Sequence, residues 1–187
     1  MEVSIGISNR HIHLTESDYK ILFGDFKMEE VKPINQPGQF ASNCFVDLKN
    51  GDNVIEHVRL LGPLRSYTQV EISQTDARKL KLNPPVRMSG HLENSSPITI
   101  VGPNGSLDLK EGCIIADRHI HMLPEQAKLY GLEGVEKVSV KINGEKGGIM
   151  ENVYLRVAPN SYYEMHIDTD DANAHLINNG DVGIIIK

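Results

Sequence analysis

The tetrapeptide Arg-His-Ile-His occurs twice in this chain, at residues 10–13 and again at residues 118–121. Side chains alternate between the two faces of an extended strand, so both histidines of each copy point the same way. The chain has eight histidines among 187 residues, a content too low to expect two such pairs with identical neighbours by chance. The repetition predicts an internal duplication with a pair of converging histidines in each half.

A second pair of matching segments adds a third polar residue to each histidine pair. Residues 70–77 (VEISQTDA) align with residues 165–172 (MHIDTDDA), and in that alignment a glutamate of the first copy stands where a histidine of the second stands. The chain therefore has two candidate ligand sets: His11, His13 and Glu71 in one half, and His119, His121 and His166 in the other. Three nitrogen or oxygen ligands with one open position are typical of a catalytic zinc site, and two such sets predict a two-metal centre.

Ordinary strand histidines are the alternative to a metal site, because a lone His-x-His pair is more often a half-exposed polar pair than a pair of ligands. The duplication and the matching third residues favour metal binding here. Two arrangements stay open: each set holds its own metal ion, or ligands from the two sets mix across the halves.

Short strand patterns separated by glycine turns dominate the chain. The alternation of Val3, Ile5 and Ile7 predicts a first strand, and Asn50-Gly51 and Asn143-Gly144 predict hairpin turns. Further strands are expected at residues 86–92, 106–109 and 112–116, a surface loop over most of residues 31–45, and short helices starting after Thr15, Thr75, Leu123 and Thr169. We predict a mainly β protein, made of two small β-barrels that are capped by short helices, related by the internal repeat, with the metal site between them.

Composition excludes several classes of partner. The net charge of -6 disfavours a nucleic-acid partner, which needs a basic surface, and no apolar run is long enough to span a membrane. Cys44 and Cys113 lie far apart and form no Cys-x-x-Cys motif, which indicates free thiols in a reducing compartment. The chain enters a strand pattern at once with no targeting segment, so we expect a cytoplasmic protein.

Two residues outside the ligand sets are candidates for binding an anion. Arg65 follows a Gly-Pro turn six residues before Glu71, and a guanidinium suits bidentate phosphate binding. Ser89 could donate a hydrogen bond to the same substrate. Arg10 and Arg118 should face away from the histidines next to them, so structural ion pairs are the better interpretation for both. His57, His91 and His175 are interpreted as ordinary surface or helix residues.

With these residues in view, the chain resembles the phosphate propanoyltransferase family, the phosphotransacylases of bacterial microcompartments and some anaerobes. The resemblance runs nearly end to end and is carried by residues 8–14 (SNRHIHL), 36–41 (QPGQFA), 61–65 (LGPLR), 68–73 (TQVEIS), 118–122 (RHIHM) and 164–170 (EMHIDTD). It implies two β-barrels with a dinuclear zinc centre, in which one ion takes His11, His13 and Glu71, the other takes His119, His121 and His166, and Arg65 meets phosphate.

The resemblance also implies domains, substrates and partners. The first strand would join the second barrel, which gives domains 10–116 and 1–9 with 117–187. The expected substrates are acyl-CoA or CoA and inorganic phosphate, with two zinc ions per chain, no nucleic-acid or membrane partner, and a homodimer as the assembly. Microcompartment members carry an N-terminal extension that directs encapsulation; none is recognised here, so association with a microcompartment is left open.

The reaction expected from this resemblance is exchange of a propanoyl or acetyl group between coenzyme A and phosphate. No acyl-accepting nucleophile stands in the motifs, so direct transfer is predicted rather than an acyl-enzyme. Two alternatives use the same residues. One is a binuclear metallohydrolase, and the other is a non-catalytic, cupin-like metal-binding module.

Overall fold

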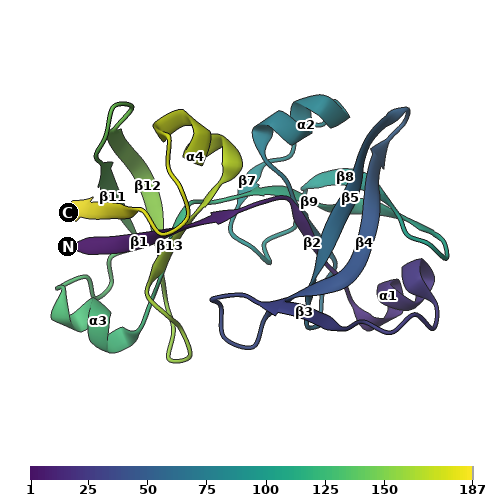
Figure 1. The fold of residues 1–187 in the computed structure, drawn as a ribbon, viewed down its shortest axis with the longest axis horizontal. Helices are drawn as coiled ribbons and strands as arrows, with labels where there is room; N and C mark the ends of the chain where they lie inside the picture. Colours follow the sequence, from purple (N-terminus) through teal and green to yellow (C-terminus); the bar gives the residue numbers. More distant parts are fainter. Residues whose placement is uncertain (187) are drawn as a thin grey trace. The chain divides into compact units, whose positions relative to one another are not determined.

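The computed structural model describes residues 1–186 and divides the chain into two compact units. The terminal unit consists of Met1–Asn9 with Asp117–Lys187, and the central unit consists of Arg10–Ala116. Strands predominate in both, and short helices cap them (Figure 1). The prediction of a mainly β fold built from small barrels is confirmed.

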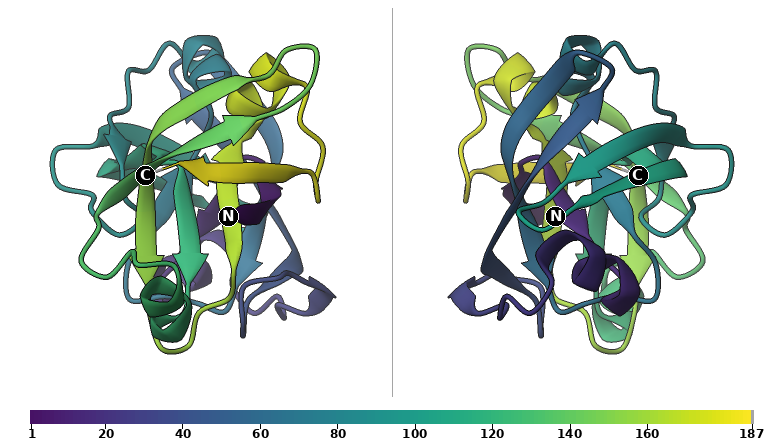
Figure 2. Two further views of the ribbon diagram at one scale, coloured as in Figure 1. Left: turned by 90° about the vertical axis from the view of Figure 1, so that its left-hand side faces the viewer. Right: turned by 90° about the vertical axis from the view of Figure 1, so that its right-hand side faces the viewer.

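The terminal unit is a closed six-stranded barrel in the order β1-β13-β10-β12-β11-β14. The last strand returns to pair antiparallel with the first, and both chain ends lie at the same end of the barrel (Figure 2, left). The buried core inside it is aliphatic and includes Val3, Ile5, Ile120, Val140 and Met165. Its elements are β1 (Glu2–Ser8), β10 (His119–Met122), α3 (Pro124–Leu129), β11 (Lys137–Ile142), β12 (Gly148–Val157), β13 (Glu164–Asp168), α4 (Thr169–His175) and β14 (Val182–Ile186).

The central unit also contains a closed ring of six strands, formed from a longer segment of the chain. The strand β8 pairs with both β4 and β9, so the pairings β4-β5-β2-β6-β9-β8 close on themselves, while β3 and β7 pair only at the margins (Figure 2, right). Its core holds Ile12, Leu14, Leu48, Leu60 and Ile100, all fully buried. Its elements are β2 (His11–His13), α1 (Glu16–Phe23), β3 (Glu30–Pro33), β4 (Phe40–Asn50), β5 (Asn53–Gly62), β6 (Gln69–Glu71), α2 (Gln74–Leu80), β7 (Val86–Arg87), β8 (Ser96–Val101) and β9 (Ser106–Ala116).

Each unit sets its histidine strand between the same kinds of neighbours. β2 runs antiparallel to β6 and parallel to β5, and β10 runs antiparallel to β13 and parallel to β12. β6 then pairs parallel with β9, as β13 does with β1. The duplication itself stays a prediction, but the two units present their histidines from equivalent strand surroundings.

Side-chain caps start three of the four described helices. Thr15 caps α1 as predicted, because its hydroxyl accepts from the Asp18 N–H at 3.2 Å. The caps of the two helices that follow β6 and β13 lie one or two residues earlier than predicted, at Ser73 and Asp168. None of the helices in residues 1–186 has the length and apolar character needed to cross a bilayer.

Three strand predictions in the central unit were wrong in detail. The segment 31–45 was predicted as a loop but is largely strand, because β3 pairs with the start of β4. All four residues of β3 are exposed, so β3 shows no alternation of apolar and polar residues. Only Val86–Arg87 of residues 86–92 is a strand, since the chain turns at Gly90, where φ is 93°. Residues 106–116 form one strand that continues through Gly112 at φ 140°, a conformation that favours glycine.

Candidate metal centre

The central cluster consists of His11, His13 and Glu71. His11 lies directly opposite Glu71 in the antiparallel pair of β2 with β6, and His13 follows two residues later on the same face. One ligand atom from each side chain lies within 4.8 Å of the other two, and His11 Nε2 is 3.5 Å from Glu71 Oε2. The structure therefore brings together three side chains that are separated by up to 60 positions in the chain.

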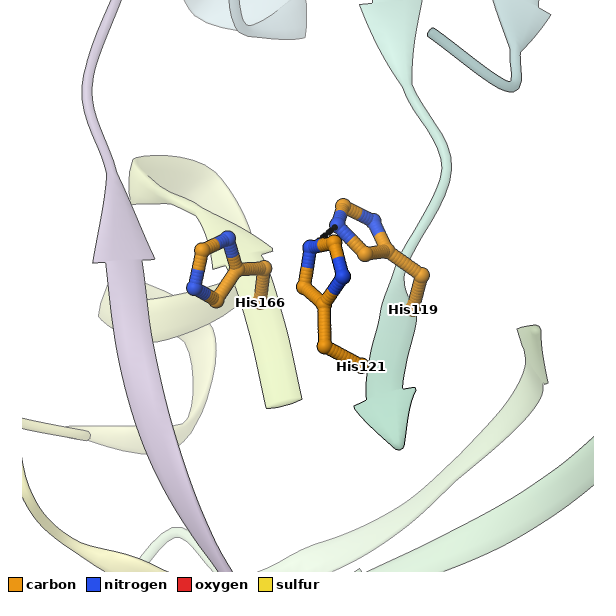
Figure 3. A group of neighbouring side chains, drawn as sticks. All are labelled: His119, His121 and His166. Carbon is orange, nitrogen blue, oxygen red and sulfur yellow. Dashed lines mark hydrogen bonds between the residues drawn. The ribbon is translucent and has the colours of Figure 1, made fainter. Parts of the chain in front are cut away.

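The terminal cluster consists of His119, His121 and His166, and it is built in the same way. His119 lies opposite His166 in the pair of β10 with β13. The Nε2 atoms of His119 and His121 are 3.2 Å apart, and the ring of His166 lies 5.2 Å from that of His121 (Figure 3). The predicted ligand atoms of this set also lie within 4.8 Å of one another.

Burial keeps several of these imidazoles neutral. It lowers the pKa of His13 to about 2, with further lowering from the electrostatic effect of the nearby His11 and Arg65 side chains, and it lowers the pKa of His121 to about 4. The pKa of His119 is also lowered well below its usual value, first by burial and then by the nearby Arg156 guanidinium. Neutral imidazoles keep a free lone pair, which is the form that binds a metal ion.

Both donor sets fit a zinc ion. Two ligand atoms on a tetrahedral zinc with bonds of about 2.0 Å are separated by about 3.3 Å, close to the spacings of 3.2 Å and 3.5 Å found in the two clusters. His119 Nδ1 lies 2.8 Å from the carbonyl oxygen of Asp117, which fixes its hydrogen there and leaves the lone pair on Nε2. Within residues 1–186, the buried Nδ1 of His13 has no hydrogen-bond partner.

Comparison with known proteins places the chain in a family. The family profile described as phosphate propanoyltransferase matches residues 4–178. The chain belongs to the phosphate propanoyltransferase family. A phosphate propanoyltransferase of Thermotoga maritima is 45% identical over 99% of this chain and 89% of its own length. Relatives of the same name from Citrobacter freundii and Salmonella typhimurium are 49% and 48% identical, each over 92% of this chain and 82% of the relative.

Membership of the phosphate propanoyltransferase family confirms two predictions made from the motifs. The resemblance is correct, and the protein is an enzyme of the acyltransferase class. The matched region includes both clusters and Arg65.

Arg65 lies beside the central cluster of this phosphate propanoyltransferase family member. Its guanidinium donates to the Tyr67 hydroxyl at 3.1 Å and to Gln39 Oε1 at 3.0 Å, and its charge is one cause of the lowered pKa of His13. Its backbone N–H donates to the Leu14 carbonyl at 2.8 Å, which ties the loop to the end of β2. These contacts orient the Arg65 guanidinium next to the histidines. A guanidinium has five N–H groups, so those that do not donate to Tyr67 and Gln39 are enough to bind an anion as well.

Ser89 contacts the central cluster through Gln69. Gln69 Nε2 donates to Ser89 Oγ at 2.8 Å and to Glu71 Oε1 at 2.5 Å, and Gln69 Oε1 accepts from the Gly90 N–H at 2.7 Å. Gln69 itself is fully buried. The predicted contact of Ser89 with substrate stays a prediction; its contact in the structure is with Gln69.

Three residues near the terminal cluster were missed by sequence reasoning. The Tyr162 hydroxyl is 2.9 Å from His166 Nε2, and its ring stacks on His121 at 4.7 Å. Glu164 Oε1 is 3.3 Å from the same Nε2. Strand parity could have found Glu164, because it lies two residues before His166 on the same face; nothing in the pattern marked Tyr162, which precedes the strand.

Arg156 is the third, and its charge is a cause of the lowered pKa of both His119 and His121. It lies opposite His121 in the pairing of β10 with β12. By sequence similarity it resembles Arg59, but Arg59 lies opposite His11, the place that Tyr154 takes in the terminal unit. The strand register therefore separates two arginines that look equivalent in the sequence.

The arginine before each histidine pair forms the predicted structural ion pair. Arg10 Nε donates to Asp76 Oδ2 at 2.9 Å, and its Nη2 lies 2.9 Å from Oδ1 of the same carboxylate. Arg118 binds both oxygens of Asp171 in the same way, at 2.7 Å and 2.8 Å. Each aspartate lies in the first turn of the helix that follows the third cluster residue, so each pair fastens a histidine strand to a helix.

Proposed function

We propose that this protein is a phosphotransacylase that exchanges a short acyl group, propanoyl or acetyl, between coenzyme A and inorganic phosphate by direct transfer at a dinuclear zinc site. Membership of the phosphate propanoyltransferase family supports the acyl transfer. The observation that carries the zinc site is the convergence of His11, His13 and Glu71, and of His119, His121 and His166, into two sets with zinc-like spacing.

The two clusters would each hold one zinc ion. When bound, zinc would supply Lewis-acid stabilisation for negative charge on oxygen and a soft acceptor for a thiolate. Neutral imidazoles from the two sets would provide the nitrogen ligands, and Glu71 would provide one oxygen ligand.

Arg65 would hold inorganic phosphate beside the central cluster. A phosphate oxygen attacks the thioester carbonyl carbon, the carbon–sulfur bond breaks, and the electron pair leaves on the coenzyme A thiolate. Phosphate and the developing negative charge repel each other, so a fixed guanidinium that binds the anion and orients it lowers the barrier.

Direct transfer is supported by the state of the two cysteines. Cys44 and Cys113, the only cysteines in the chain, are both buried, and burial raises the pKa of Cys113 to about 12. A buried thiol with so high a pKa is a poor nucleophile. The proposed reaction therefore passes through a complex of both substrates without an acylated protein.

The proposed assembly is a homodimer and the proposed compartment is the cytoplasm. The dimer rests on the family resemblance, and sedimentation of the purified protein tests it. Two free, buried cysteines are consistent with a reducing compartment.

The decisive experiment is phosphate-dependent release of coenzyme A from acetyl-, propanoyl- and butanoyl-CoA, with and without a chelator. We expect thiol release only with phosphate, formation of acyl phosphate in equal amount, two zinc ions per chain, and loss of activity with the chelator. Thiol or other product release without phosphate would instead indicate a metallohydrolase. One metal ion and no turnover would indicate a cupin-like binding module, and an acylated side chain after acyl-CoA alone would overturn direct transfer.

A further inference from the structure

Gln69 and Glu164 occupy equivalent positions beside the two clusters, but one side chain is an amide and the other is a carboxylate. Gln69 lies two residues before Glu71 and opposite His13, and Glu164 lies two residues before His166 and opposite His121. Both side chains are largely buried, with Gln69 at 0% and Glu164 at 9% exposure. Each of them contacts the third residue of its cluster, so the two positions can be compared directly.

Gln69 faces Glu71 with its NH₂ group. The Gly90 backbone N–H can only donate, and it lies 2.7 Å from Gln69 Oε1, which fixes the amide oxygen on that side. The NH₂ group then donates to Glu71 Oε1 at 2.5 Å. The other oxygen of Glu71 is the one that lies 3.5 Å from His11 Nε2. The amide therefore holds one carboxylate oxygen and leaves the second toward the histidines.

Glu164 faces His166 with a carboxylate. Its Oε1 is 3.3 Å from His166 Nε2, and the Tyr162 hydroxyl is 2.9 Å from the same nitrogen. Figure 3 shows that the other nitrogen, Nδ1, is on the ring edge toward His119 and His121. A carboxylate can only accept, so this contact favours a hydrogen on Nε2 and leaves the lone pair of Nδ1 toward the cluster.

The terminal barrel makes room for this carboxylate at Gly6. Gly6 pairs with His166 across β1 and β13, and a Cβ atom built on it would overlap Glu164 Oε1 and lie 3.2 Å from His166 Cδ2. A glycine inside a strand weakens the strand unless a close approach requires it. The Glu164 carboxylate occupies the space that any other residue at position 6 would fill.

We propose that Gln69 and Glu164 are positioning residues whose chemistry is matched to the ligand each one contacts, an amide donor for a carboxylate ligand and a carboxylate acceptor for an imidazole ligand. This inference rests on the zinc centre of the proposed function. Under this proposal each zinc ion would have one carboxylate nearby. Glu71 would be a ligand in the central cluster, and Glu164 would contact the ligand His166 in the terminal cluster. Outer partners of this kind set the orientation and basicity of ligands and change metal affinity by about 10- to 100-fold.

Zinc affinity of single clusters tests the proposal without using activity. In a Glu71→Ala background, only the terminal cluster binds tightly, and there we expect Glu164→Gln to weaken zinc binding by about 10- to 100-fold in competition with a chromophoric chelator. The matched control is Glu133→Gln, the same change at an exposed turn residue. In a His166→Ala background, Gln69→Glu should weaken the central site, because it sets two carboxylates side by side.

A transplant provides the second test. Glu71→His alone gives the central cluster a third imidazole beside an amide, and Glu71→His with Gln69→Glu places a carboxylate two residues before that imidazole, as in the terminal cluster. We expect the double variant to bind zinc at least about tenfold more tightly than the single one. Circular dichroism and thermal melting of every variant show whether the barrel has folded.

Three outcomes would overturn the matching. The first is an equal zinc affinity of the Glu164→Gln and Glu133→Gln variants. The second is an unchanged zinc affinity of the central site in the Gln69→Glu variant. The third is a zinc affinity of the Glu71→His variant that does not depend on whether residue 69 is Gln or Glu. A parent protein that binds no zinc would remove both this inference and the proposed centre. If the zinc affinities change as expected but coenzyme A release does not depend on phosphate, the result would contradict the proposed function alone and support the inference.

Discussion

The two clusters of this protein combine the same strand arrangement with different side chains. In both, a His-x-His strand runs antiparallel to the strand of the third residue. The arginine before the histidines binds an aspartate in the helix that follows the third residue. The central cluster has a carboxylate as its third member and an amide behind it; the terminal cluster has an imidazole with a carboxylate behind it. Backbone pairing thus sets where the three side chains meet, and the proposed role of the residue two positions earlier on the strand is to match its hydrogen-bonding group to the third member of the cluster.

The largest expected effect comes from removing the third member of either cluster. Glu71→Ala and His166→Ala should each reduce zinc from two ions to one per chain and lower turnover by about a thousandfold or more, because each removes a Lewis acid from the proposed site. Metal analysis after gel filtration and the coenzyme A release assay measure the two effects. His57→Ala is the control, since His57 stacks on Phe45 and belongs to neither cluster. Loss of both ions from one substitution would break the comparison, because it would mean shared ligands.

The arginines beside the two clusters should differ in their effect on phosphate. Arg65→Lys should lower kcat/KM for phosphate by about a hundredfold with zinc retained, since an ammonium cannot replace the planar fork. Arg156→Lys should change kcat/KM for phosphate by about tenfold or less. Steady-state kinetics with phosphate varied at saturating acyl-CoA separates them. The reverse order would assign phosphate to the terminal cluster.

Acid should destabilise the metal-free terminal unit more than the central unit. The pKa of His121 is lowered to about 4 and that of His13 to about 2, while His119 is lowered too. Below the unfolded pKa of about 6.5 the unfolded chain binds more protons than the folded one, so stability is complete above that pH and falls as the pH drops toward the folded values.

At pH 5.5 this linkage predicts a loss of about 1 kcal/mol in the central unit, from His13. The terminal unit should lose more, because the pKa values of both His119 and His121 are lowered, although His121 contributes less than a fully buried group because it is partly exposed. Hydrogen exchange followed by NMR at pH 7 and pH 5.5 resolves the two units. Equal losses would contradict the predicted ranking of the two units, and stability that increases on acidification would contradict the neutral state of these imidazoles.

The last comparison concerns the stability that the two arginine–aspartate pairs contribute. The Asp76 side chain is 5% exposed and that of Asp171 is 22% exposed. Asp76→Asn should therefore lower the free energy of unfolding by about 2 kcal/mol and Asp171→Asn by about 1 kcal/mol, since a charge-assisted bond contributes more where water is excluded. Urea titration of the metal-free variants measures both, with the exposed Asp25→Asn as control. A larger loss for Asp171→Asn would show that burial does not rank the two pairs.

Much of the site could be predicted from the sequence because its parts are local. Strand parity places His11 with His13 and His119 with His121, and a short alignment of two segments adds Glu71 and His166. Family motifs of five to seven residues then led to the acyltransferase class, which the comparisons support. The mainly β character followed from short alternating runs and glycine turns.

The tertiary structure decided what depends on pairing between distant strands. Only the register of β10 with β12 distinguishes Arg156 from Arg59, and only the packing of β1 on β13 lets the Glu164 carboxylate lie over Gly6. The exposed ribbon of β3 was missed for the same reason, since it is held by hydrogen bonds to β4 and buries no alternating apolar face. Sequence periodicity shows which side chains share a face of one strand. It carries no information on which strand lies beside that strand, and the neighbouring strand determines the contacts of every cluster residue.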